Sequence, residues 1–355
     1  MMALHRNIAI VMELRALPLI LSAIFLLFFN SVVLEAQDIH FTQFNAAPLL
    51  TNPANTGMSG EDFRFANIFR SQWSKIGVPF ETFSSSIDKK VIISNQFFAI
   101  GGAIVHDQSS SFNLTTNEFL FSVSYSKFIN NHQFTFGLQP GFVSRSYNLR
   151  GVTFGSQFDQ SGSMYNSSLP SNESGMSDRL SYFDLNAGVF WRTMIGSVLP
   201  SAGISVNHIN MPVEKFSTAS SGSRLPVRIT MNGNVFFPLT SRIDITPCFL
   251  YSFTRGAHEL LLGSSGDFAV NSSGIPVKKL YALTMVRVNP PRNMDAFILG
   301  GGVKFQKINL GFTYDFNISS LSRVTNFNGA FEISLVYTGG RDNRKNISQP
   351  CYILN

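Results

Sequence analysis

The stretch Ile308–Asn317 reads INLGFTYDFN, and its residues alternate between apolar and polar along the whole length. The apolar positions are Ile308, Leu310, Phe312, Tyr314 and Phe316. A repeat of two residues predicts a β-strand with one apolar and one polar face. About ten residues is also the length that a tilted strand needs to cross the hydrocarbon of a bilayer. The apolar face must therefore meet either a protein core or lipid.

The same alternation recurs along the chain and predicts fourteen strands. We place them at residues 62–73, 80–89, 95–106, 116–129, 132–147, 181–192, 199–209, 226–238, 241–254, 257–268, 277–288, 296–305, 307–317 and 329–338. Two of these segments are less regular than the rest. Segment 80–89 contains few apolar residues, and segment 277–288 fits either register.

The composition indicates where the apolar faces lie. Charged residues make up 14% of the chain, whereas about 25% is usual in soluble domains. Aromatic residues make up 13%, including 35 Phe, which is more than a soluble protein of this size can bury easily. The net charge of +6 is not gathered into a basic stripe, so we expect no nucleic-acid partner. The two cysteines, Cys248 and Cys351, are too few for a disulfide framework.

The connections between the predicted strands support a barrel. The segments 148–180 and 210–225 are long and polar, and both fall at the same predicted end. Very tight turns fall at the opposite end, at Asn130-Asn131, Leu239-Thr240 and Gln306. Only Arg255-Gly256 is short where a long loop is expected. Because a β-sandwich has no reason to separate its loops in this way, we predict an all-β, antiparallel transmembrane barrel of about fourteen strands spanning 61–340.

Both ends of the chain are expected to lie outside the barrel wall. Residues 1–36 predict a secretory signal peptide, since the apolar run Ala16–Phe29 is short for a spanning helix and a plausible cleavage site follows. An uncleaved anchor is the alternative. Residues 341–355 form a basic, polar tail that we expect in the periplasm.

Residues 37–60 show neither a strand nor a helix repeat. They contain Pro48 and the turn-prone run Asn52-Pro53-Ala54-Asn55. Such a segment either enters the barrel from the periplasmic side as a plug or hangs free. Its apolar residues, Phe41, Phe44, Leu49 and Leu50, favour the plug.

Candidate functional residues lie on the polar faces, which would line the lumen. Arg64, Arg70, Asp315 and Glu332 fall on strands that become neighbours when the sheet closes, so these charges can pair across strands. They either neutralise and fill the lumen or serve transport or binding. Apolar residues also interrupt these faces, and they either contact the plug or line an apolar pocket: Phe190, Phe236 and Leu250.

No catalytic arrangement stands out. The histidines after the predicted cleavage site show no metal-ligand spacing, and His106-Asp107 falls where a strand would reach the rim. Gly300-Gly301-Gly302 lies within a strand, where small residues ease close approach rather than bind phosphate. We therefore expect no enzyme, no cofactor and no metal.

Several motifs resemble one known family. They are QDIHFTQFNAAPLLTNPANTG (37–57), FRFANIFRSQW (63–73), ETFSSSID (81–88), INLGFTYDFNISSLSR (308–323) and GAFEISLVY (329–337), followed by the late Cys351. Together they resemble the PorP/SprF family of type IX secretion membrane proteins of Bacteroidota. The family's tail often ends in a Cys-Pro pair, whereas here Pro350 precedes Cys351.

The resemblance implies a location and a set of partners. It implies a barrel in the outer membrane, surrounded by lipid and related to the fatty-acid transporter FadL. Family members serve secretion and gliding motility: some contact periplasmic components, and others hold adhesins that carry a C-terminal sorting domain. The positions implied as important are Asn52, Pro53 and Ala54 in the plug-like segment and Tyr314, Asp315 and Glu332 near barrel closure.

Three functions from different classes remain open. The first is a non-enzymatic outer-membrane barrel that anchors or helps to export a surface protein. The second is a FadL-like transporter of hydrophobic small molecules, which needs an apolar internal pocket. The third is a secreted soluble β-protein, which would be extracted without detergent.

Overall fold

The computed structural model describes residues 39–74, 78–109, 114–147, 155–159, 162–166, 168–170, 178–215, 222–270, 277–290, 294–320 and 322–340. The predicted signal peptide (1–36) and the predicted tail (341–355) lie outside the described residues. Parts of the long segments 148–180 and 210–225 also lie outside them.

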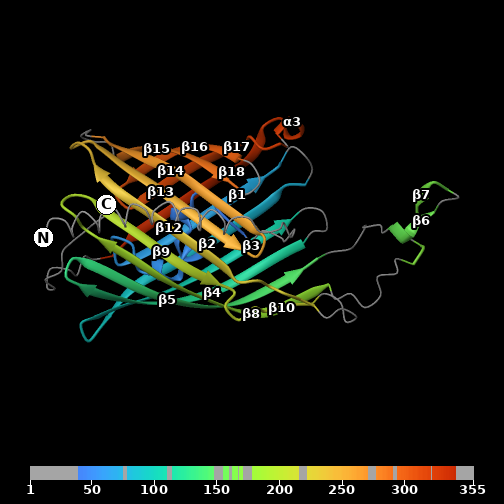
Figure 1. Cartoon of the computed structure of the whole chain (residues 1–355), viewed down its shortest axis with the longest axis horizontal. Coiled ribbons are helices and arrows are strands. Elements are labelled where there is room, and N and C mark those ends of the chain that lie inside the picture. Colours follow the sequence, from blue (N-terminus) through green and yellow to red (C-terminus); the bar gives the residue numbers. More distant parts are fainter. Residues whose placement is uncertain are drawn as a thin grey trace, which may run out of the picture.

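Fourteen antiparallel strands close into a barrel in which the last strand pairs with the first (Figure 1). The strands are β1 (Phe63–Gln72), β2 (Phe80–Ile93), β3 (Gln96–Ser109), β4 (Leu114–Ile129), β5 (His132–Ser146), β8 (Arg179–Thr193), β9 (Leu199–Asn207), β12 (Arg228–Pro238), β13 (Ile243–Thr254), β14 (Ala257–Ala269), β15 (Val277–Val288), β16 (Met294–Phe305), β17 (Ile308–Asn317) and β18 (Asn328–Gly339). The predicted fold class is confirmed, and most predicted strands lie within a few residues of the observed ones.

The faces of the barrel are inverted relative to a soluble protein. In β17, Phe312 is 49% exposed on the outer surface, whereas Asp315 in the same strand is 1% exposed in the interior. The same division holds in β5, where Phe136 and Leu138 are exposed and Gln139 is buried. An apolar outer surface around a polar interior is the arrangement of a membrane-spanning barrel.

The two ends of the barrel differ in their connections. The wall begins and ends at the same end, because Phe63 at the start of β1 pairs with Gly339 at the end of β18. That end also carries the two-residue turns after β2, β4 and β16. In barrels of bacterial outer membranes, short turns face the periplasm and long loops face outwards. We therefore name these the periplasmic end and the outer end.

Most of the longer connections lie at the outer end, as expected. Two of them contain hairpins outside the wall, β6 (Phe158–Asp159) with β7 (Met164–Tyr165) and β10 (Val213–Glu214) with β11 (Ser223–Arg224). A third contains the short helix α3 (Ser322–Thr325). Figure 1 shows the β6–β7 hairpin well beyond the barrel, at the right of the view. The turn at Arg255-Gly256 is the exception, since it joins β13 and β14 directly at this end.

Aromatic side chains mark both borders of the apolar surface. At the outer end, the rings of Trp73 and Phe80 meet edge to face with centroids 5.4 Å apart. At the periplasmic end, the rings of Trp191 and His132 stack with centroids 6.0 Å apart. Aromatic rings with a polar edge suit the membrane–water interface at each side of a barrel.

Residues 39–60, which we call the lumen segment, lie inside the wall (Figure 1, blue). They form η1 (Phe44–Ala46), α2 (Pro48–Thr51) and η2 (Pro53–Asn55). Within the described residues, no helix is both long and apolar enough to cross a bilayer.

Candidate functional site: the lumen and its N-terminal segment

The local shape of the lumen segment follows from its prolines and Asn52. Pro48 and Pro53 each stand in the first turn of a short helix, where the missing N–H costs no hydrogen bond. The Asn52 side-chain oxygen accepts a hydrogen bond from the Ala54 N–H at 2.9 Å and so caps η2. This motif therefore forms a compact turn that needs no partner strand.

The turn at Asn52–Ala54 rests on a part of the wall built from glycine. A Cβ added to Gly137 in β5 would lie 2.3 Å from the backbone of Pro53 and Ala54. A Cβ on Gly188 in β8 would lie 2.0 Å from the Asn52 side chain, and one on Gly203 in β9 would lie 2.7 Å from it. Asn52 is fully buried there, and its amide nitrogen donates to the Val189 carbonyl at 3.2 Å. Close approach of the segment to the wall therefore depends on the absence of side chains.

Near the outer end, the backbone of the lumen segment binds a buried carboxylate. The backbone N–H groups of Thr42 and Gln43 donate to the two oxygens of Glu332 in β18, at 2.7 and 2.8 Å. Arg70 of β1 donates to Glu332 at 2.6 Å and to Asp315 of β17 at 3.1 Å. All five residues are buried, so these bonds form away from solvent.

A second arginine completes this group of charges. Arg287 in β15 donates to Asp315 at 2.9 Å and also to the Thr42 hydroxyl. Arg287 is 3% exposed, and its Nε lies 3.7 Å from Glu259 in β14, which in turn lies 3.4 Å from His40. Two guanidinium groups and three carboxylates thus share one buried network that includes the lumen segment. A charge that loses its partner in such a network is costly.

Sequence reasoning did not single out Arg287. It lies in segment 277–288, whose register the sequence left open, and only the register with Met285 inward places Arg287 in the lumen. The signal available in the sequence was the pair of inward-facing acids, Asp315 and Glu332, which need buried cations nearby to balance their charge. A search for such a cation could have found Arg287.

Arg64, the fourth predicted lumen charge, lies apart from the other three. It pairs with Asp88 of β2 at 2.9 Å and donates to the Asn55 carbonyl at 2.9 Å. Asp88 also accepts from the Gly57 N–H at 2.6 Å. The four residues were expected to form one group. They belong instead to two groups, one at each end of the lumen segment. The reason is position along the strand, because Arg64 and Arg70 are six residues apart on β1.

Apolar side chains also hold the lumen segment. The ring of Phe44 belongs to a buried cluster on the inner side of β13 to β16, which comprises Cys248, Leu250, Leu261, Met285, Ala296 and Ile298. Of the three apolar residues predicted to face inwards, Leu250 contacts the segment through this cluster. Phe190 lines a cavity beside it, and Phe236 is half-buried.

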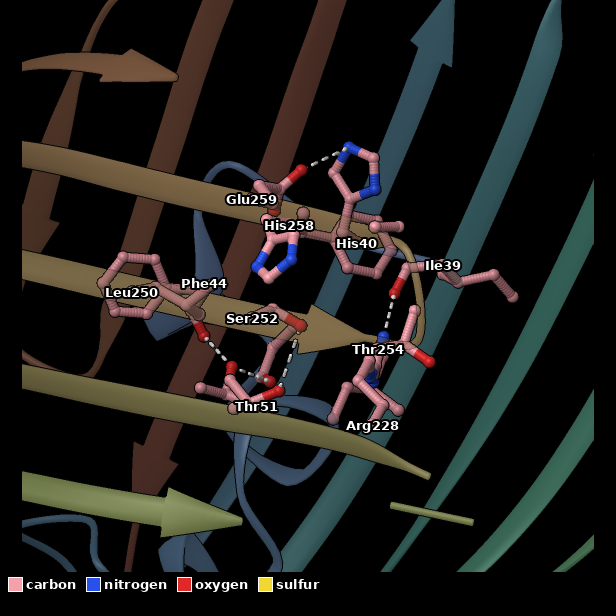
Figure 2. A pocket seen from close by; sticks show the side chains of 15 residues that line it. Ile39, His40, Phe44, Thr51, Arg228, Leu250, Ser252, Thr254, His258 and Glu259 are labelled. Atoms are coloured by element: carbon pink, nitrogen blue, oxygen red, sulfur yellow. Dashed lines mark hydrogen bonds and ion pairs between the residues drawn. The ribbon is translucent and has the colours of Figure 1, made fainter. Parts of the chain in front are cut away.

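Small cavities lie beside the lumen segment within the barrel. A pocket of about 70 Å³ lies between the lumen segment and β12 to β14. Figure 2 shows His40 beside Glu259 and Phe44 beside Leu250 in this pocket. Thr254 and Ala257 line it, so it lies at the outer end, next to the Arg255-Gly256 turn. A second cavity of about 180 Å³ lies between the segment and β5, β8, β9 and β12, towards the periplasmic end.

The candidate residues near the rim and in β17 take part in hydrogen bonds of the barrel wall. The described residues contain no group of three potential metal ligands among His, Cys, Asp and Glu. His106 is exposed and bonds to Asn117 at 2.8 Å, while the neighbouring Asp107 accepts from the Thr82 hydroxyl at 2.6 Å. Tyr314, which the resemblance implied, faces outwards and donates to Asn328 at 3.3 Å. These are ordinary contacts of a barrel wall.

The geometry defines a class of protein: a transmembrane β-barrel that carries its own N-terminal segment in the lumen. The sequence matches the family described as "Type IX secretion system membrane protein PorP/SprF" over residues 33–337. The chain belongs to this family, and its location is the outer membrane. No curated protein matches the sequence.

Among solved structures, similar chains include FadL-like barrels. The toluene transporter TbuX of Ralstonia pickettii is 9% identical, with a TM-score of 0.46 over 82% of this chain and 92% of that one. The monoaromatic hydrocarbon channel CymD is 8% identical, with a TM-score of 0.48 over 83% and 93%. A FadL homologue of Pseudomonas aeruginosa is 12% identical, with a TM-score of 0.42 over 81% and 92%.

Proposed function

We propose that this chain is a non-conducting, non-enzymatic component of the type IX secretion machinery that holds a secreted surface protein at the outer membrane. The observation that carries the proposal is the lumen segment, which is attached at both of its ends to the neighbouring strands β18, β1 and β2 and, between its ends, to β5. Glu332 binds its beginning, Arg64 and Asp88 bind its end, and Gln139 binds the Leu49 carbonyl between them at 3.0 Å. A barrel filled in this way is suited to anchoring rather than to passage.

The outer end provides the surface for such a partner. The β6–β7 hairpin stands beyond the barrel, and its apolar side chains are exposed there: Phe158 by 42%, Met164 by 63% and Tyr165 by 56%. Exposed apolar groups on a polar segment outside the membrane are typical of protein contacts. Membership of the family supports a secretion component as the partner, and the resemblance suggests an adhesin with a C-terminal sorting domain.

A transporter of hydrophobic small molecules is the second candidate. The cavity of about 180 Å³ favours it, because Phe44, Phe128, Phe190 and Leu199 give the cavity an apolar lining. Against it, the cavity lies on the periplasmic side of the lumen segment and the smaller pocket lies on the outer side. Transport would require the segment to move.

The proposal is tested by removing the exposed apolar groups of the hairpin. In the variant Phe158→Ser, Met164→Ser, Tyr165→Ser, we expect the surface protein to appear in the medium instead of on the cells, as in a strain that lacks the barrel. Surface proteins released by mild protease treatment and proteins in the medium would be compared by mass spectrometry.

The control variant is Ile195→Ser, Leu239→Ser, which removes two exposed apolar residues from turns at the periplasmic end. It should leave the surface protein in place. Normal surface proteins in the strain without the barrel would overturn the proposal. Lipid that co-purifies with the wild-type barrel, together with altered uptake of a hydrophobic compound in the strain that lacks the barrel, would favour the transporter instead.

A further inference from the structure

Exposed cations surround the periplasmic end of the barrel. We call them the basic rim, and they are Lys89 in β2, Lys127 in β4, Arg242 between β12 and β13, Lys278 in β15 and Lys307 between β16 and β17. They come from widely separated parts of the chain, so they are distributed around the barrel and do not form one patch.

Acidic residues do not balance the rim. Asp244 and Asp267 are ion-paired to Lys279 and Lys304, at 2.8 and 2.5 Å. Glu61 and Asp62 are half-buried. Within the part of the chain that the structure describes, this end therefore presents exposed cations and no exposed carboxylate.

The outer end is different, because exposed charges of both signs occur there. The cations include Arg179, Arg224 and Arg255, and the acids include Glu81 and Asp178. Exposed cations outnumber exposed acids at both ends, but among the described residues only the periplasmic end lacks an exposed carboxylate.

Three cations of the rim lie on the surface that faces lipid. Lys89 follows Ile87, Lys127 precedes Ile129, and Lys278 precedes Leu280 on the same face of each strand; the apolar partners are 55%, 53% and 46% exposed. Exposed Ile93 and Ile129 lie nearer the strand ends than Lys89 and Lys127, so these lysines lie among the last apolar residues of the wall at this end. A lysine stem can lie along apolar surface while its ammonium reaches the polar layer.

The aromatic border identifies the same level. Phe134 in β5 pairs with Lys127 on one side and with Trp191 on the other. Trp191 donates to His132 at 3.2 Å, with its ring on the outer surface beside that residue. Lysine and indole at the same level of a membrane border lie where lipid phosphates are found.

We propose that the basic rim binds the phosphate groups of anionic phospholipids in the periplasmic leaflet. The charge is complementary, and the position at the edge of the apolar band favours lipid over a soluble partner. Binding there fixes the depth and orientation of the barrel in the membrane. The proposal does not depend on the surface-protein function proposed above.

The chain contains two tryptophans, and they report on the two ends separately. Trp73 lies at the outer border and Trp191 at the periplasmic one. The full chain would be reconstituted as Trp73→Phe or as Trp191→Phe in phosphatidylcholine vesicles that contain brominated phosphatidylglycerol, which quenches nearby indoles. Brominated phosphatidylcholine in matched vesicles gives the reference.

From the quenching of Trp191, we expect the binding preference for phosphatidylglycerol over phosphatidylcholine to be about fivefold. This is the effect of one cation near an anionic surface. The preference should vanish at high salt and in the variant Lys89→Gln, Lys127→Gln, Lys278→Gln. The control variant Arg179→Gln, Arg224→Gln, Arg255→Gln should keep it, and Trp73 should show little preference.

Equal quenching by both lipids at Trp191 would overturn the proposal. A preference that persists in the triple-lysine variant would also overturn it. If that variant instead keeps its lipid preference but no longer co-purifies with an acidic periplasmic protein, the rim binds protein and the lipid assignment is wrong.

Discussion

Gly137 in β5 and its neighbours on β8 and β9 show how single residues shape the lumen. Each of them lies where the Asn52–Ala54 turn contacts the wall, and a side chain there would occupy the same space. The turn motif was visible in the sequence because proline and asparagine have strong local preferences. The glycines were not identified as its partners, because they lie on strands more than eighty residues away along the chain.

Alanine at position 137 should loosen the lumen segment. The added methyl would lie 2.3 Å from the Pro53 backbone, which cannot move aside as a flexible side chain does. Overpacking of this kind costs about 1–3 kcal/mol, so amide exchange in residues 49–58 should accelerate about tenfold or more. Hydrogen exchange followed by mass spectrometry measures this.

Gly266→Ala is the matched control for that substitution. It places a methyl on β14, where no atom lies within 4 Å, so exchange in the lumen segment should not change. If amide exchange in the lumen segment is the same in the two alanine variants, the contact between the turn and the wall does not stabilise the segment.

At the scale of the element, the lumen segment is held by charges that belong to the closure of the barrel. Glu332 lies in the last strand and Arg70 in the first, and the two residues are directly paired. The sequence could predict the polar faces of these strands, because alternation is local. It could not predict that Arg64 would serve a different site, since that depends on heights along tilted strands. Arg287 was not predicted because the sequence left open which face of segment 277–288 points into the lumen.

The substitution Glu332→Gln should destabilise the barrel and release the start of the segment. It removes one of the carboxylates that compensate Arg70 and weakens two backbone hydrogen bonds. Loss of one partner from a buried charge network costs about 3–5 kcal/mol. Urea unfolding in detergent micelles would measure the change, together with faster exchange around Thr42.

Glu81→Gln serves as its control, since Glu81 is exposed in β2 at the outer end and should have little effect on stability. A similarly small effect of Glu332→Gln would mean that the network does not hold the segment.

At the scale of the whole molecule, the sequence predicted the architecture well. Alternation, low charge and the separation of long from short connections all favoured a barrel, and each follows from the lipid environment. What alternation did not predict is the apolar cluster inside β13 to β16. These strands carry Leu261, Met285 and Ile298 inwards because Phe44 of the lumen segment covers them. This apolar cluster on an otherwise polar face can be explained only when the position of the lumen segment inside the barrel is known.

The filled lumen is the central claim, and ion conductance tests it most directly. The full-length chain in a planar lipid bilayer should show no steady conductance, because the lumen segment fills the barrel beside small cavities such as those of about 70 and 180 Å³. A variant that lacks residues 39–57 should open stable, ohmic steps in the same bilayer. Steps of equal size from the full-length chain and from the shortened one would contradict the account.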